Sequence, residues 1–324
     1  RMFESRCLPS PRKRLSTPAN SRCGALGLEA SDILPASTGV IGAQLKMDLW
    51  EKAAPALAAN LGKATPEDFA KAIMTTDAFH KISHREVSLP GGVVKLVGMA
   101  KGAGMICPNM ATMLSVVLCD AQVEASVWQK MLRDAVELTF NRVTVDGDTS
   151  TNDTLYGLAN GASGVSASDE ESLKALSAAL TSVLGDLAYM LVKDGEGASK
   201  VARIHVAGAA SDADAERVAR TVGHSQLVKT ALYGRDANWG RIVAAVGRSG
   251  ADFNPDDVVV TLCGVELFRK GQPTDQDFDA LLEEPLKQRD LPIDIVLGSG
   301  SGSYTLLASD LGHEYVNVNA DYRS

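Results

Sequence analysis

The residue with the clearest chemical potential is Thr112, which lies where the flexible segment KGAGMICPNMATML (101–114) becomes a β-rich run. If the bond between Ala111 and Thr112 were cut, Thr112 would become a chain terminus. Its α-amine, with a reference pKa of about 7.7 to 8.0, could then act as base for its own hydroxyl. One residue would supply both nucleophile and base. On composition alone, the alternative that this loop only turns the chain stays open.

Two further Gly-, Thr- and Asn-rich loops lie at predicted strand ends, PASTGVIG (35–42) and DGDTSTNDT (146–154). Asp146, Asp148 and Asp153 in the second of these suggest a divalent cation. The run lacks the order of an EF-hand and its terminal glutamate. We therefore interpret it as a hydrogen-bonded loop beside the strand that follows Thr112.

Other catalytic and metal-binding patterns are absent from the sequence. There is no GxSxG elbow, Walker loop, HExxH motif or strand-borne GxGxxG, so α/β-hydrolase, P-loop, zincin and Rossmann interpretations lose their sequence support. His80 and His84 have the spacing of a helical metal pair, but they lie past the predicted helix and lack a third ligand. A metal site is therefore not favoured, and structural roles are favoured for His205, His224 and His313.

Composition indicates a folded, soluble protein of one large or two ordinary domains. The chain has 324 residues, 45% of them hydrophobic and 22% charged, and its longest apolar runs fall short of the ~18 to 20 residues that span a bilayer. The net charge of −8 disfavours nucleic-acid binding. The short apolar runs predict no membrane partner. Five cysteines without a CxxC pair indicate a reducing compartment.

The elements that would position these loops interleave helices and strands. Thr65, followed by Pro66 and two acids, predicts a helix start, and that helix should run through Met74. Runs 84–89 and 93–99 predict a hairpin around residues 90–92. Apolar spacing predicts further helices over 123–138, 171–193 and 213–222, and strands over 112–119, 199–207, 258–268, 293–297 and 315–319. The fold class is α+β, with mixed or antiparallel sheets.

The chain divides into three predicted segments. Residues 1–30 form an atypical leader or fragment end, in which residues 1–23 are basic and contain one acid, as an organelle transit peptide would. A disordered or misassembled leader is the open alternative. Residues 31–200 are expected to form the domain that bears the nucleophile, and 201–324 a C-terminal domain whose tail returns to the site.

Six strings resemble, in order, those of the ornithine acetyltransferase family, also called arginine biosynthesis bifunctional protein or glutamate N-acetyltransferase. They are PASTGVIG, KGAGMICPNMATML, FNRVTVDGDTSTNDT, DGEGASK, KTALYGRDANWGRI and VNVNADYRS. The resemblance runs from about residue 33 to residue 324. It implies an αββα sandwich like that of N-terminal nucleophile enzymes, with a smaller C-terminal α/β domain. It also implies self-cleavage between Ala111 and Thr112, which would give chains 1–111 and 112–324.

The same resemblance assigns the site residues. It implies that Thr38 and Gly39 donate a hydroxyl and a backbone N–H to the oxyanion. The substrate-binding residues that it implies, beside Thr112 itself, are Thr75, Lys101, Glu196, Asn319 and Ser324. Lys101 is expected to pair with a substrate carboxylate and Glu196 with the ammonium of ornithine. Without the resemblance, both would be expected to be solvated surface charges. Ser324 is the last residue, so its use requires the tail to dock.

The implied activity is transfer of acetyl from N2-acetyl-L-ornithine through Thr112 to L-glutamate, by a ping-pong route. No metal and no dissociable cofactor are expected, and members assemble as heterotetramers of two α and two β chains. Some members also accept acetyl-CoA, which the sequence leaves open. The expected compartment is the cytoplasm for a bacterial protein and the mitochondrial matrix or plastid for a eukaryotic one.

Two alternatives remain from the sequence. An amidohydrolase or aminopeptidase of similar architecture would transfer the acyl group to water. An inactive, N-terminally truncated fragment is suggested by residues 1–30, which do not resemble the segment that family members carry before the PASTGVIG string. A missing segment would leave sheet edges and apolar faces exposed.

Overall fold

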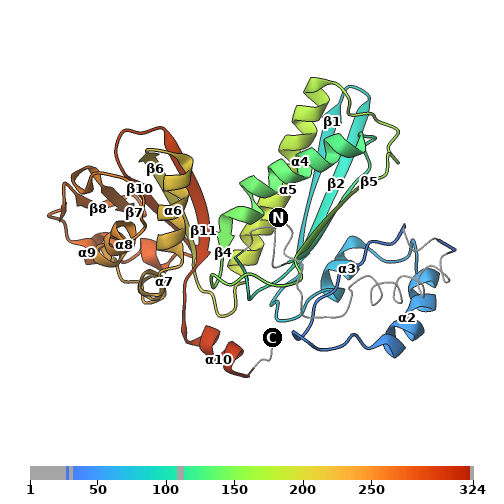
Figure 1. Ribbon diagram of the computed structural model, residues 1–324, viewed down its shortest axis with the longest axis horizontal. Helices are drawn as coiled ribbons and strands as arrows, with labels where there is room; N and C mark the ends of the chain where they lie inside the picture. The colour runs from blue at the N-terminus through green and yellow to red at the C-terminus, as the bar shows by residue number, and fades with distance from the viewer. Residues whose placement is uncertain (1–26, 29–31, 108–112, 322–324) are drawn as a thin grey trace. The chain divides into compact units, whose positions relative to one another are not determined.

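The structure is a computed structural model, and it describes residues 27–28, 32–107 and 113–321 (Figure 1). Contacts divide the chain into two units, Arg1–Phe69 with Arg323–Ser324, and Ala70–Tyr322. Three predicted site residues, Ala111, Thr112 and Ser324, lie outside the described residues. Each unit is described by itself.

The first unit contains helix α2 (Met47–Ala59) and the start of α3 (Pro66–Ala72). Thr65 caps α3 as predicted: its Oγ1 accepts a hydrogen bond from the Asp68 N–H at 3.2 Å, and the Asp68 carboxylate accepts one from the Thr65 N–H at 2.9 Å. The helix ends at Ala72, two residues before the predicted end. The PASTGVIG string precedes α2 in irregular structure, and Thr38 and Gly39 are exposed there.

A four-stranded sheet begins the second unit. Its order is β1 (Lys81–Leu89), β2 (Gly92–Lys101), β3 (Leu114–Cys119) and β5 (Thr154–Ala159). The predicted hairpin is confirmed, since β1 and β2 are antiparallel with Leu89 opposite Gly92. Strand β2 also pairs antiparallel with β3, and β3 pairs parallel with β5. The loop that carries Thr112 therefore connects two neighbouring strands.

Helices α4 (Ala125–Leu138) and α5 (Glu170–Lys193) cover one face of this sheet (Figure 1). By length and hydropathy alone, α5 could span a membrane. Nine of its residues are buried, and it packs across β1 and β2, as the core helix of a globular domain does. The opposite face carries Leu118 and Leu158, which are exposed. Within the described residues, this domain thus shows one helical layer on one sheet.

Helix α5 approaches the sheet closely at Gly98 of β2. A Cβ atom at this position would lie 2.6 Å from Cγ1 of Val183 and 2.9 Å from Cδ1 of Leu187, both on α5. Only glycine leaves room for this contact. The close packing holds the C-terminal end of β2, and with it Lys101, near the C-terminal end of the helix.

The second sheet has seven strands in the order β4-β11-β6-β10-β7-β8-β9 and a hydrophobic core of its own. Helix α6 (Asp212–Gly223) packs on β11 and β6, which are antiparallel neighbours. The strands are β4 (Val143–Thr144), β6 (Val201–Ala209), β7 (Val259–Leu262), β8 (Val265–Arg269), β9 (Gln272–Pro273), β10 (Asp290–Val296) and β11 (Gly302–Ser309). The other α-helices of the described residues are α7 (Gln226–Tyr233), α8 (Trp239–Gly247), α9 (Phe278–Leu282) and α10 (His313–Asp321). The α+β class is confirmed.

Two predicted strands were wrong. Residues 258–268 form two strands, β7 and β8, because Cys263 and Gly264 adopt positive φ values of 50° and 82° and make a two-residue hairpin turn. Residues 315–319 lie in α10. The alternating apolar residues of this segment do not pack on a sheet, since α10 has no buried residue. The Asn319 side chain donates a hydrogen bond to the Tyr315 carbonyl, one helical turn earlier, at 2.9 Å.

The contact at Gly98 predicts the effect of a single added methyl group. Gly98→Ala should lower the free energy of unfolding by about 1 to 3 kcal/mol, because the methyl group overpacks the interface between α5 and β2. Gly247→Ala is the control, since a Cβ there meets nothing within 4 Å and alanine favours the helix. Urea unfolding of both variants measures the difference. Equal stability of the two would contradict the packing described.

Candidate active site

Lys101 and Thr75 form the first part of the candidate site. Lys101 is the last residue of β2, and Thr75 lies in the loop between α3 and β1. The Lys101 Nζ donates a hydrogen bond to Thr75 Oγ1 at 3.0 Å. The backbone N–H of Thr75 in turn donates to Oδ2 of Asp77 at 3.0 Å. The cation and the hydroxyl are thus held as a pair, suited to bind a carboxylate.

Glu196 and Asn319 form the second part. The Asn319 Nδ2 donates to Oε2 of Glu196 at 2.8 Å, although the two residues are far apart in the sequence. The Glu196 N–H donates to the Ala103 carbonyl at 2.9 Å. The Glu196 carboxylate lies against Gly104, where a Cβ would come within 2.6 Å of both oxygens. The glycine at 104 therefore lets an acid lie beside the segment that leads to Thr112.

The two parts of the site interact electrostatically, because the Glu196 carboxylate of the second part affects the pKa of Lys101 in the first. Burial lowers the pKa of Lys101, and the ammonium of Lys81 lowers it further. The carboxylates of Asp77, Asp153 and Glu196 act in the opposite direction. Lys101 is thus a partly desolvated cation among acids, which strengthens its interaction with an anionic ligand.

Asp146 holds the loop that precedes Thr112. Its carboxylate accepts hydrogen bonds from the N–H groups of Met105 at 2.6 Å and Ile106 at 3.0 Å, and from the Tyr315 hydroxyl at 3.4 Å. Burial raises the pKa of Asp146, and these backbone donors offset part of that rise. The 146–154 loop is thus a hydrogen-bonded loop that ties residues 105–106 to α10, which carries Asn319.

No cluster suited to a metal ion occurs in the described part of the chain, where no three His, Cys, Asp or Glu side chains converge. His84 lies in β1, so the helical spacing from His80 does not apply. Asn238 caps α8 by accepting from the Arg241 N–H at 3.1 Å, and Trp239 stacks on Phe268. These two contacts fix the start of α8.

Asp153 is a residue whose role the sequence analysis missed. It precedes β5, whose Thr154 N–H donates to the Met113 carbonyl at 2.7 Å, beside Thr112 in the sequence. Burial raises the pKa of Asp153 to about 8, and Lys101 offsets part of this rise. Its buried Oδ2 has no hydrogen-bond partner among the described residues. An acid directly before a strand was the signal in the sequence.

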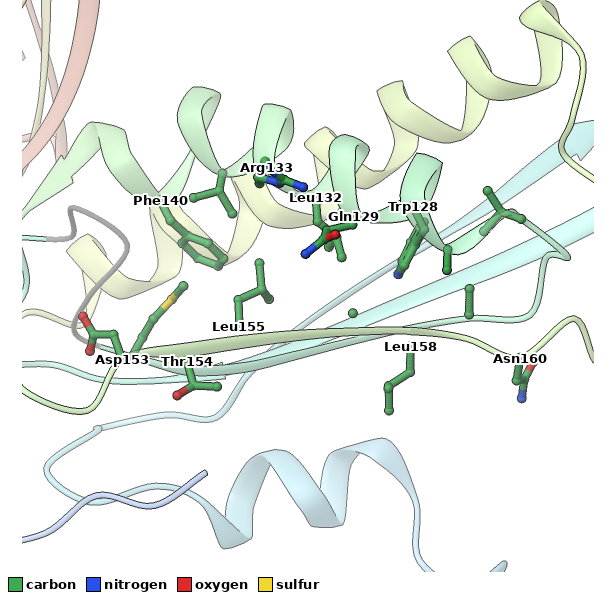
Figure 2. Close-up of a pocket in the computed structure, with 16 residues that line it drawn as sticks. Trp128, Gln129, Leu132, Arg133, Phe140, Asp153, Thr154, Leu155, Leu158 and Asn160 are labelled. Carbon is green, nitrogen blue, oxygen red and sulfur yellow. The ribbon is translucent and has the colours of Figure 1, made fainter. Parts of the chain in front are cut away.

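A cavity of about 900 Å³ lies beside Asp153, between α4 and β5 (Figure 2). Its wall is mostly apolar, with Leu132 and Phe140 on the helical side and Leu155 on the strand. The indole Nε1 of Trp128, which also lines the cavity, is buried and has no hydrogen-bond partner among the residues that the structure describes. The apolar wall explains why the Asp153 carboxyl favours its neutral form.

The structure brings four predicted site residues together in pairs: Lys101 with Thr75, and Glu196 with Asn319. Ala103 and Gly104 connect the pairs, because they follow Lys101 in the chain and contact Glu196. Thr38 and Gly39 belong to the first unit, Arg1–Phe69 with Arg323–Ser324. The roles assigned to all of these residues stay predictions.

The raised pKa of Asp153 makes stability depend on pH. Between pH 4 and pH 8 the folded protein keeps a proton on Asp153 that the unfolded chain has lost, so this group's contribution to stability falls as pH rises. Asp153→Asn removes that loss. Its free energy of unfolding, relative to the parent chain, should increase from pH 5 to pH 8. Urea unfolding at both values measures this, and a constant difference would contradict the assignment.

Comparison with known proteins agrees with the motifs. A sequence profile described as the ArgJ family matches residues 13–324. The arginine biosynthesis bifunctional protein ArgJ of Nitratidesulfovibrio vulgaris is 72% identical over 300 residues, which cover 93% of this chain and 76% of that protein. The protein of the same name from Syntrophotalea carbinolica is 46% identical over 310 residues, 94% of this chain and 79% of that protein.

A solved structure is also similar. The crystal structure of arginine biosynthesis bifunctional protein argJ from Bacillus halodurans has a TM-score of 0.62 and 37% sequence identity; the match covers 65% of this chain and 100% of that chain. Profile, sequence and structure agree with the six motifs, and the chain therefore belongs to the ArgJ family.

Proposed function

We propose that this chain is an acetyltransferase of arginine biosynthesis, which moves an acetyl group from N2-acetyl-L-ornithine to L-glutamate. The observation that carries the proposal is the paired placement of Lys101 with Thr75 and of Glu196 with Asn319, next to the segment that leads to Thr112. A cation, an acid, a hydroxyl and an amide are the groups that an amino-acid substrate requires. Family membership at 72% identity supports the same activity.

Maturation begins with attack of the Thr112 hydroxyl oxygen on the Ala111 carbonyl carbon. The peptide C–N bond breaks as an ester forms, and the nitrogen takes up the hydroxyl proton. Water then hydrolyses the ester, which leaves Ala111 with a carboxylate and Thr112 with a free α-amine.

Transfer proceeds in two half-reactions at the same hydroxyl. The Thr112 α-amine accepts the hydroxyl proton as the oxygen attacks the acetyl carbonyl, and ornithine leaves with that proton on its amine. The glutamate amine then attacks the acetyl ester, and the Thr112 oxygen recovers a proton as N-acetylglutamate leaves. Thr38 and Gly39 stabilise the oxyanion of each step.

The described side chains serve recognition. Lys101 and Thr75 bind the α-carboxylate that both substrates share, and Glu196 binds the side-chain ammonium of ornithine. Ser324 completes the pocket when the tail docks. In the cell, two copies of each cleaved chain form the active assembly, in the compartment where arginine precursors are made.

Substitution of the nucleophile tests self-cleavage. Thr112→Ala should remain one chain of 34.1 kDa and lack transfer activity, because it has no hydroxyl to attack the Ala111 carbonyl. Thr112→Ser keeps a hydroxyl and should still be cut. Mass spectrometry of the purified proteins locates the cut, and normal two-chain processing of the alanine variant would refute the mechanism.

The acceptor dependence separates acetyl transfer from hydrolysis. With N2-acetylornithine labelled in its acetyl group, we expect label in N-acetylglutamate only when glutamate is present. Little free acetate should form in its absence. Chromatography with mass detection measures both products. Steady acetate release without glutamate would instead identify an amidohydrolase.

A further inference from the structure

A buried cluster of three charges lies beneath the Lys101–Thr75 pair. The side chain of Lys81 at the start of β1 is fully buried, as is that of Asp77, and that of Asp194 is 2% exposed. The Lys81 Nζ donates to Oδ1 of Asp77 at 2.6 Å and also to Oδ2 of Asp194. We call Asp77, Lys81 and Asp194 the buried triad.

Both carboxylates of the triad also accept backbone hydrogen bonds. Asp77 accepts from the Gly102 N–H through Oδ1 at 2.7 Å and from the Thr75 N–H through Oδ2 at 3.0 Å. Asp194 accepts from the Ala78 N–H at 3.2 Å. The triad therefore joins the loop before β1, the end of β2 and the turn after α5.

Each of these three segments carries a proposed substrate-binding residue. Thr75 belongs to the first segment and Lys101 immediately precedes Gly102. Glu196 follows Asp194 by two residues, in the turn that ends α5. No member of the triad needs to reach the substrate to affect these groups, because it acts through their backbone.

The charge state fits this role. Burial alone would raise the pKa of Asp77, but the Lys81 ammonium and the Gly102 and Thr75 N–H groups lower it overall. Asp77 is therefore an ionised acceptor at neutral pH. Its charge also opposes the effect of burial on the pKa of Lys101. Within the triad, Asp77 thus supports both the position and the cationic form of Lys101, whereas the Lys81 ammonium opposes the cationic form.

Stability is a weak reason for such a cluster. Removing three charged groups from water carries a large free-energy cost, and apolar residues of similar volume often stabilise a core as well or better. Oriented carboxylates can hold specific N–H groups in place, which apolar side chains cannot do.

We propose that Asp77, Lys81 and Asp194 are positioning residues, which hold Thr75, Lys101 and Glu196 in the arrangement that binds the amino-acid substrates. The assignment of a binding role to those three residues rests on the proposed function. The placement itself depends only on the hydrogen bonds described.

Asp77→Asn is the sharpest test, because asparagine has the same shape. If the carbonyl oxygen of the new side chain accepts from Lys81 and Gly102, the NH₂ group of that side chain faces the Thr75 N–H. Both groups are donors, so the hydrogen bond that holds Thr75 is lost. We expect the apparent KM for N2-acetylornithine to rise about tenfold or more with a smaller change in kcat, since misplaced binding groups weaken substrate binding. A crystal structure should show the Lys101 Nζ beyond hydrogen-bond distance of Thr75 Oγ1.

A second pair of variants separates positioning from stability. Lys81→Met should raise KM, whereas Lys200→Met should lower the melting temperature without raising KM. Lys200 is a matched control because it is also buried, but its Nζ donates to the Leu286, Lys287 and Gln288 carbonyls in the second sheet's domain. Asp194→Asn gives a further measurement if Lys81→Met does not fold.

Two results would overturn the proposal: an unchanged KM together with an intact Lys101–Thr75 contact in Asp77→Asn, or equal KM increases in the two lysine variants. Failure of the proposed function looks different, since the parent protein would then make no N-acetylglutamate. The crystal structure of Asp77→Asn still decides the placement in that case.

Discussion

The arrangement of the candidate site depends on one buried ammonium group, that of Lys81, between the carboxylates of Asp77 and Asp194. A buried charge must be paired, so the two acids that contact this ammonium cannot move away from it without a large cost. One acid lies before β1 and the other at the end of α5. The buried triad therefore holds the C-terminal end of α5 next to the start of β1.

The packing of α5 on the sheet brings these ends into contact. Leucine and valine side chains along the buried face of the helix meet β1 and β2, and Gly98 permits the close approach of Val183 and Leu187. The helix ends where the two strands carry Lys81 and Lys101. Apolar packing thus sets the distance between α5 and the sheet, and the hydrogen bonds of the buried triad fix the orientation of the segments at their ends.

The acids near the site differ in state because their surroundings differ. Asp77 is ionised because a cation and two N–H groups contact it. The Oδ2 of Asp153 lies beside an apolar cavity and has no hydrogen-bond partner in the described ranges, so the carboxyl keeps its proton up to about pH 8. Asp146 lies between these cases, with burial opposed by backbone donors. Residue type alone does not distinguish the three.

Much of the local structure follows from local sequence. The hairpin at residues 90–92, the cap of α3 at Thr65 and the long helix α5 were predictable, because turn residues, capping residues and apolar spacing act over a few positions. The strand predicted over 315–319 failed for the same reason. Five alternating residues fit either a strand or a short helix, and only the absence of a sheet neighbour decides between them.

The sequence by itself determined the family, through six motifs in order, and the set of residues that could do chemistry. Only the tertiary structure decided which of them meet: Glu196 with Asn319, Lys101 with Thr75, and the buried triad beneath them. Motifs are short-range patterns, whereas these contacts join residues up to 123 positions apart. Long-range contacts depend on how helices and sheets pack, which local sequence does not specify.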